Sequence, residues 1–108
     1  MKRIKIVPTV EVEGIDGKKE AFPMSKWLET AIKATKLFGQ GFSNIATGMK
    51  LMKAIETQMV EGAEHLKIED ADFAKLKDAV NMCEWNPNVA FQIFDYFKAV
   101  EEAEDCNE

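Results

Sequence analysis

The chain has few of the side chains that covalent or metal-assisted catalysis requires. It holds one histidine, two cysteines and two serines, Ser25 and Ser43. Both serines stand where we expect a helix to begin, and serine is a favoured N-cap residue. A nucleophilic hydrolase needs a nucleophile, a base and a group that orients the base. We therefore expect no catalytic residue, no cofactor and no enzyme.

The single histidine, His65, does not predict a metal site. Glu61 precedes it by four residues, a spacing that places two side chains on one face of a helix. Gly62 interrupts that helix, and no second histidine or cysteine lies nearby to complete a ligand set. Cys83 is the one cysteine that could pair with this histidine, and it falls at a core-facing helical position. We expect a polar connector over residues 61–67.

Long apolar runs are also absent, and cysteines are too few for a disulfide framework. Cys83 and Cys106 are interpreted as reduced thiols, although a bond between them stays open because separation in sequence does not measure distance. The apolar stretch after the basic start is too short for a signal peptide. The sequence predicts one domain over residues 1–108, with no membrane segment and a cytoplasmic location.

Basic residues are missing from the C-terminal end. The net charge of −5 arises over residues 101–108, which hold five acidic residues and no basic one. A neutral body with an acidic tail argues against nucleic-acid binding as the main function. We interpret the tail as a solvated helix end, with docking on a basic partner as the alternative. The one basic concentration is Lys2, Arg3, Lys5, Lys18 and Lys19. The alternative function is therefore a nucleic-acid-binding regulator that uses this basic N-terminal hairpin.

Alternating apolar residues predict a β-hairpin over residues 1–22. Ile4 and Ile6 share one side of the first extended stretch, and Val10 and Val12 alternate with glutamates. Asp16-Gly17 is a strong turn signal, after which residues 18–22 can return as a strand. A lone hairpin is marginal in water, so it must pack on helices or pair with another chain.

Apolar residues then recur at helical spacing in four segments, 26–38, 45–60, 70–83 and 87–103. Asn86-Pro87 is the clearest boundary, with Asn at the N-cap and Pro at the first helical position. The predicted buried face of the second segment is Ile45, Met49, Met52, Ile55 and Met59. That of the fourth is Ala90, Ile93, Phe94, Phe97 and Val100. The sequence therefore predicts an α+β fold, mostly α. An N-terminal β-hairpin packs on a bundle of three to four helices, with a helical part over residues 25–104 and an acidic C-terminal tail.

Two features indicate a binding surface. Met49, Met52 and Met59 on one helix would make an adaptable apolar surface. The fourth segment has more aromatic residues than one helical stripe can bury, and an aromatic-rich core explains them equally well. The predicted partner or self-association surface is Trp85, Phe91, Phe94, Tyr96 and Phe97. We expect a non-enzymatic protein-binding module that forms a homodimer through this segment.

The second half of the chain also carries a pattern of helix-cap and core motifs. A lysine-rich helix, Lys50-Leu-Met-Lys-Ala-Ile55, precedes an acidic helix start in Leu66-Lys-Ile-Glu-Asp-Ala-Asp-Phe73. Leu76-Lys-Asp-Ala-Val80 and Asn86-Pro-Asn-Val-Ala-Phe-Gln92 follow. The pattern resembles small uncharacterised helical proteins of tailed bacteriophages and prophages, over about half the chain. The resemblance implies a phage-encoded accessory or assembly protein, or a modulator of a host protein, in the bacterial cytoplasm. It carries over no catalytic residue.

Overall fold

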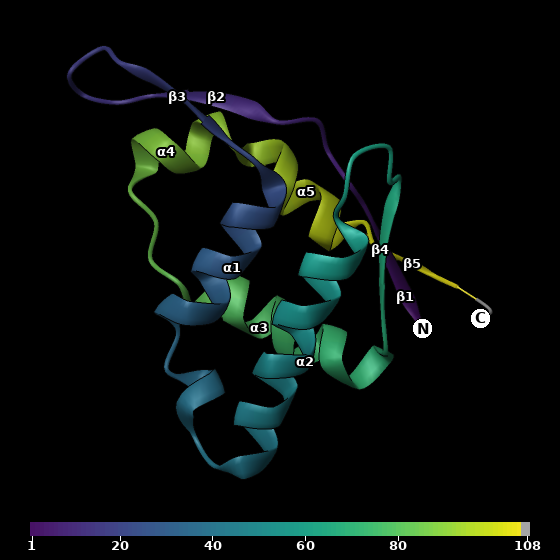
Figure 1. Ribbon diagram of the computed structural model, residues 1–108. Helices are drawn as coiled ribbons and strands as arrows, with labels where there is room; N and C mark the ends of the chain where they lie inside the picture. Colours follow the sequence, from purple (N-terminus) through teal and green to yellow (C-terminus); the bar gives the residue numbers. More distant parts are fainter. Residues whose placement is uncertain (107–108) are drawn as a thin grey trace.

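Helices dominate the computed structural model, which describes residues 1–106 (Figure 1). They account for 55% of the described residues and strands for 17%, which confirms the predicted α+β, mostly α fold. The helices are α1 (Met24–Ala34), the 3-10 helix η1 (Leu37–Gly39), α2 (Phe42–Gln58), α3 (Asp70–Met82), α4 (Pro87–Gln92) and α5 (Phe94–Glu101). The strands are β1 (Lys2–Lys5), β2 (Val10–Glu13), β3 (Lys19–Phe22), β4 (His65–Ile68) and β5 (Glu104–Asp105).

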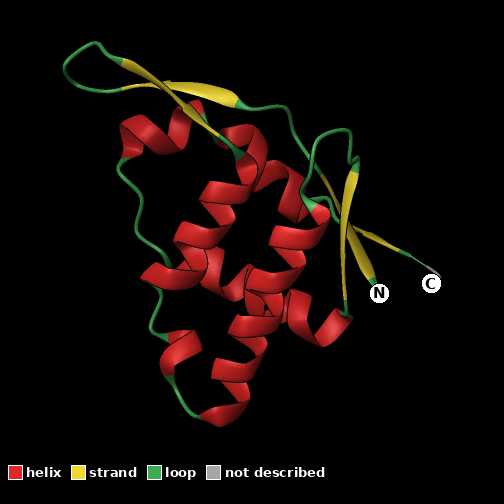
Figure 2. Cartoon of the chain, in the orientation of Figure 1, coloured by secondary structure: helices red, strands yellow, loops and turns green. Residues whose placement is uncertain are grey.

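Strands β2 and β3 form an antiparallel hairpin whose register pairs Val10 with Phe22. The turn closes with a 3.0 Å hydrogen bond from the Gly17 N–H to the Gly14 carbonyl. Gly17 has a φ of 79°, a left-handed conformation that glycine adopts without steric cost. The hairpin lies across α4 and α5 at one end of the molecule (Figure 2). This part of the predicted hairpin is confirmed.

Strand β1 does not belong to that hairpin, so the predicted range of 1–22 is wrong at its start. It is the middle strand of a second, antiparallel sheet with the order β4-β1-β5. Leu66 and Ile68 of β4 are buried, whereas His65 and Lys67, which alternate with them, are only half-buried; this alternation is typical of a strand. Residues 65–67 of the predicted polar connector therefore belong to strand β4, which contributes Leu66 to the core.

The predicted fourth helix is two helices that meet at Ile93. Asn86 caps α4 as predicted, because its side chain accepts a 2.9 Å hydrogen bond from the Asn88 N–H. At Ile93 the backbone leaves helical geometry, with φ −108° and ψ 22°. The break changes the face that α5 presents to the core: Tyr96 is buried and Phe94 is exposed. The prediction placed Phe94 on the buried face of this helix and Tyr96 outside that face.

The core centres on Trp27 of α1, which is fully buried. Its ring lies 4.9 Å from that of Phe97, 5.6 Å from that of Tyr96 and 6.2 Å from that of Trp85, measured between ring centres. Such tilted and edge-on ring pairs add stabilisation beyond the burial of their area. The aromatic residues before and within α5 thus hold α1 in place.

Neither serine caps a helix, contrary to the prediction. Ser25 lies in the first turn of α1, whose N-cap is Pro23. Ser43 lies in the first turn of α2, whose N-cap is Gly41 at φ 86°. The two helices therefore begin without a side-chain cap.

Candidate protein-binding surface

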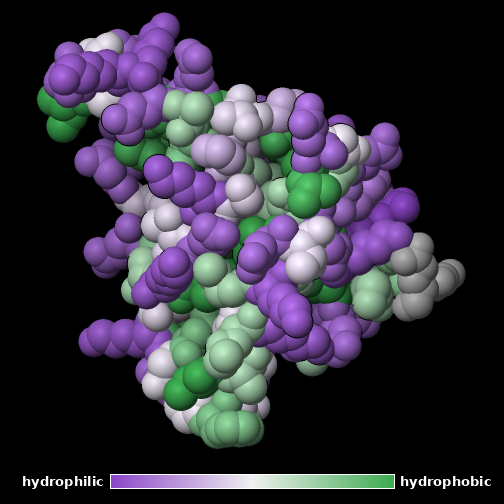
Figure 3. All heavy atoms as spheres, in the orientation of Figure 1, coloured by the Kyte–Doolittle hydropathy of each residue, from purple (hydrophilic) through white to green (hydrophobic). Residues whose placement is uncertain are grey.

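An apolar groove of about 630 Å³ lies between the end of α1, η1 and α2. It is lined by Ile32, Lys33, Thr35, Phe38, Gly39, Ile45, Gly48, Met49, Met52, Lys53 and Glu56. Figure 3 shows hydrophobic residues gathered at the same end of the molecule, over η1 and the first turns of α2. A concave apolar surface with a few polar groups at its edge is the usual form of a binding site.

Gly48 and Phe38 form the floor of this groove. Phe38 packs so closely on α2 that a Cβ added at Gly48 would lie 2.9 Å from the Phe38 Cβ, closer than packed carbon atoms approach. A glycine inside a helix costs about 1 kcal/mol relative to alanine. That cost is offset here because only glycine lets η1 approach the helix.

Large apolar side chains stand exposed beside the groove. Met49 of α2 is 70% exposed, and Ile45, one turn earlier on the same helix, is 43% exposed. The prediction placed Ile45 and Met49 on the buried face of this helix, and that is wrong. The buried line of α2 is Gly48, Leu51 and Ile55, so the helix turns part of its apolar stripe outward.

Lysines mark the edge of the groove. Lys33 of α1 and Lys53 of α2 line it with the single carboxylate of Glu56. Neither lysine forms an ion pair within residues 1–106. The groove therefore combines an apolar centre with two cations at its edge that are available to a partner.

The five aromatic residues predicted as a partner surface do not come together on one surface. Tyr96 is fully buried, and Trp85 and Phe97 pack against Trp27 in the core, with the Trp85 and Phe97 ring centres 5.9 Å apart. Only Phe91 and Phe94 are exposed, by 80% and 63%. The core alternative thus holds for three of the five residues, and an apolar pair remains at the α4–α5 break.

The predicted basic patch is divided between two places. Lys2, Arg3 and Lys5 lie on β1, whereas Lys18 and Lys19 lie at the turn end of the hairpin. Lys2 forms a 2.7 Å ion pair with Asp105, and Arg3 a 2.9 Å ion pair with Glu104. These contacts raise the pKa of Lys2 and lower the pKa values of Glu104 and Asp105, mainly through the side-chain hydrogen bonds. The acidic tail was predicted as a solvated helix end, and Glu101 does end α5 and is exposed. Glu104 and Asp105 instead form strand β5, and Glu108 lies outside the described residues.

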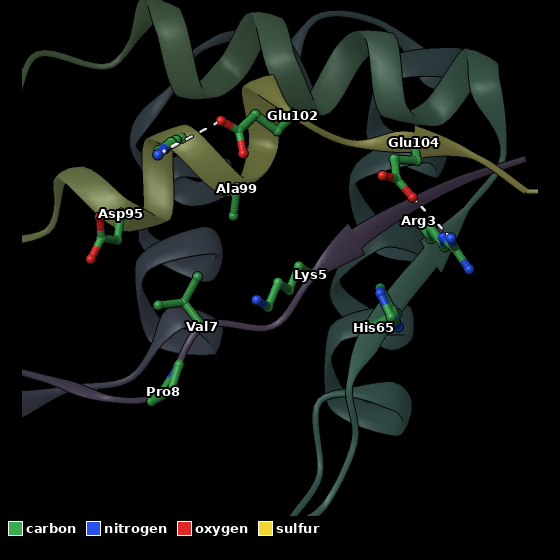
Figure 4. Close-up of a pocket in the computed structure, with 10 residues that line it drawn as sticks. Arg3, Lys5, Val7, Pro8, His65, Asp95, Ala99, Glu102 and Glu104 are labelled. Atoms are coloured by element: carbon green, nitrogen blue, oxygen red, sulfur yellow. Dashed lines mark hydrogen bonds and ion pairs between the residues drawn. The ribbon is translucent and has the colours of Figure 1, made fainter.

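His65 borders a polar hollow of about 360 Å³ between β1 and α5 (Figure 4). Its wall carries charges of both signs, including Lys5, Asp95 and Glu102. Within residues 1–106, no three histidine, cysteine or acidic side chains are grouped so that they could hold a metal ion. None of the helices in that part of the chain combines the length and apolar character needed to cross a membrane.

The two cysteines are free thiols in the structure. Burial, followed by the nearby charge of Glu84, raises the pKa of Cys83. A raised pKa disfavours the thiolate, which is the reactive form of cysteine. The structure therefore gives Cys83 no environment that would activate it as a nucleophile.

Comparison with known proteins found no match: no family model fits the chain, and no curated protein or solved structure is similar to it. Among the groove residues that the sequence reasoning missed are Phe38 and Gly48. A glycine in the middle of an apolar helix was a signal for the last of these, because such a glycine often marks a close approach by another segment.

Proposed function

We propose that this chain is a non-enzymatic protein-binding module that holds an amphipathic helix of a partner protein in the groove between η1 and α2. One observation carries the proposal: Ile45 and Met49 stand exposed, by 43% and 70%, in an apolar groove whose floor is Phe38. Soluble proteins seldom leave large apolar side chains grouped beside a concavity unless a partner covers them.

The shape and chemistry of the groove favour a helix as its occupant. It is bounded by helical segments and lined by Ile32, Met49 and Met52, so apolar residues at every third or fourth position of a partner helix could enter it. Methionine side chains adapt to partners of differing shape. Lys33 and Lys53 at the edge favour acidic residues on either side of the partner's apolar face.

The affinity expected for such a groove is moderate. Full burial of one large apolar side chain stabilises by about 1.5–3 kcal/mol, and association loses translational and rotational freedom. Burial of three anchoring residues would stabilise the complex by about 4.5–9 kcal/mol before that loss, so the Kd should be weaker than micromolar. Reversible binding in this range suits an accessory or assembly protein, or a modulator of a host protein. The resemblance to phage proteins predicts the same roles.

Selection from a library of helical peptides tests the proposal without knowledge of the partner. Peptides selected on the unmodified chain should carry apolar residues at every third or fourth position and acidic residues beside them. Met49→Glu should weaken their binding about tenfold or more, because it places a carboxylate against the apolar face.

Met82→Glu is the matched control for this experiment. Met82 is also an exposed helical methionine, but it lies on α3, outside the groove. We expect the selected peptides to bind Met82→Glu as they bind the unmodified chain. The proposal fails if no family of peptides is enriched, or if the enriched peptides bind both variants equally well.

A further inference from the structure

Strand β5 is a weakly held cover over an edge of β1. It is two residues long, Glu104 and Asp105, and both are exposed. Its side chains form ion pairs with Arg3 and Lys2, and these two basic side chains are also partly exposed. Exposed ion pairs contribute little to stability. A segment of this kind opens at a small fraction of the free energy needed to unfold the whole domain.

The edge beneath β5 is formed without it. Strand β1 pairs along its whole length with β4, from Lys2 opposite Ile68 to Lys5 opposite His65. Ile4 in the middle of β1 is fully buried. Release of β5 would therefore leave β1 in place with one row of main-chain groups open to a new strand.

The hydrogen bonds of β1 show that this row extends beyond β5. The Ile6 N–H donates to the Glu64 carbonyl on the β4 side, whereas the Met1 carbonyl accepts from the Cys106 N–H on the β5 side. The main-chain N–H and C=O groups of successive residues in an antiparallel strand point to opposite neighbouring strands. The main-chain groups of Lys5 therefore point to the β5 side, as those of Met1 do. Strand β5 pairs only with Lys2 and Arg3, and no other strand within residues 1–106 lies on that side of Lys5.

The open part of the edge adjoins the polar hollow. Figure 4 shows Lys5 extending into the hollow between β1 and α5. Arg3 and Glu104 line the same hollow. Lys5 forms no ion pair within the described residues. The edge thus presents three cations, of which Lys2 and Arg3 bind the acidic residues of β5 and Lys5 does not.

We propose that the β1 edge is a second interaction surface, which takes an extended acidic segment of a partner protein in place of β5. The added strand would form main-chain hydrogen bonds with β1 and place its carboxylates beside the three cations. Charge complementarity favours this occupant, because the chain itself fills the edge with the acidic pair Glu104 and Asp105. This surface is separate from the groove and does not depend on the function proposed for it.

The test uses the full chain with the charges of β5 reversed, Glu104→Lys with Asp105→Lys. The probe is a synthetic peptide with the sequence of residues 101–106 in which Cys106 is replaced by serine. Amide chemical shifts of the labelled protein report both the site and the affinity. We expect shifts at Arg3 and Lys5, weaker binding at high salt, and an affinity about fivefold or more above that of the unmodified chain, whose own tail competes.

Asp78→Lys with Glu84→Lys is the matched control, because it makes the same change in net charge at exposed residues that line neither the hollow nor the β1 edge. This control should bind the peptide as weakly as the unmodified chain. Glu104→Gln with Asp105→Asn opens the edge without charge reversal and should give an intermediate affinity, which keeps the test usable if the reversed variant does not fold. Equal affinity of both lysine variants, or no shift at Arg3 and Lys5, would overturn the proposal.

Discussion

The phenolic oxygen of Tyr96 lies 2.9 Å from the main-chain nitrogen of Val10 and accepts its hydrogen bond. The same hydroxyl donates to the carbonyl of Phe22, the residue opposite Val10 in the hairpin. One buried side chain of α5 thereby holds both strands of the hairpin. Nearby, Gln92 of α4 exchanges two hydrogen bonds with the main chain of Glu13, at 2.8 and 2.9 Å.

Tyr96→Phe should destabilise the protein while keeping its fold. The change keeps the ring in the core but leaves the Val10 N–H and the Phe22 carbonyl without their partner. Loss of one partner of a buried hydrogen bond costs about 1–3 kcal/mol. Unfolding in urea should show this loss, and hydrogen exchange should be faster at the Val10 amide. An unchanged urea midpoint together with unchanged exchange at Val10 would contradict this role of the hydroxyl.

Tyr96 should also make the protein less stable at alkaline pH. Burial raises the pKa of its hydroxyl above the ordinary value of 10.0, against the smaller opposing effect of the Val10 hydrogen bond. Above about pH 10 the unfolded chain releases this proton while the folded chain still holds it, so unfolding becomes more favourable. The contribution is fully present below pH 10 and is lost as the pH rises through the raised value. The free energy of unfolding in urea should be measured from about pH 8 to pH 11, the range where tyrosine titrates. It should fall more steeply with pH for the unmodified chain than for Tyr96→Phe.

Gly48→Ala should displace Phe38 and deform the floor of the groove. The added Cβ would meet the Phe38 Cβ at 2.9 Å, and that atom cannot move unless the backbone of η1 moves with it. The strain should exceed the gain of about 1 kcal/mol that alanine brings to a helix, so the protein loses stability. Thermal unfolding and the chemical shifts of residues 37–39 would measure the two effects.

Gly39→Ala is the control for this prediction. Gly39 also lines the groove, but an added Cβ there would meet no atom within 4 Å. We expect this variant to match the unmodified chain or to exceed it slightly in stability. A Gly48→Ala variant that is as stable as Gly39→Ala would show that η1 is free to retreat from α2.

The sequence predicted those parts of the fold that short-range chemistry determines. Asn86-Pro87 supplies a side-chain acceptor and a fixed φ at the start of α4, and Asp16-Gly17 supplies a tight turn. Both signals act within a few residues, so the neighbouring chain has little influence on them. Helix α3 was predicted over residues 70–83 from the helical spacing of its apolar residues and is found over Asp70–Met82.

The sequence analysis named Met49 and Met52, which line the groove, as part of an adaptable apolar surface. The rest of the candidate site could not be predicted, because it depends on which side of a helix meets the core. Along α2, Met49 and Leu51 are both apolar, and the approach of η1 at Gly48 decides that Leu51 is buried and Met49 is exposed. Along α5, the break at Ile93 decides the same question for Tyr96 and Phe94. Strand β5 is a third case, because its pairing with β1 joins residues at opposite ends of the chain.

Phe91 and Phe94 are the residues through which we predict self-association. They are the exposed apolar pair at the α4–α5 break, and their removal leaves the buried Tyr96 untouched. Phe91→Ser with Phe94→Ser should therefore convert a dimer into a monomer without loss of helix content, whereas Tyr96→Ser would unfold the hairpin contact and report nothing on association. Sedimentation velocity gives the mass, and circular dichroism gives the helix content. Ile15→Ser, at an exposed apolar residue of the hairpin turn, is the control and should stay dimeric. If the unmodified chain sediments as a monomer, the two phenylalanines do not form a dimer interface.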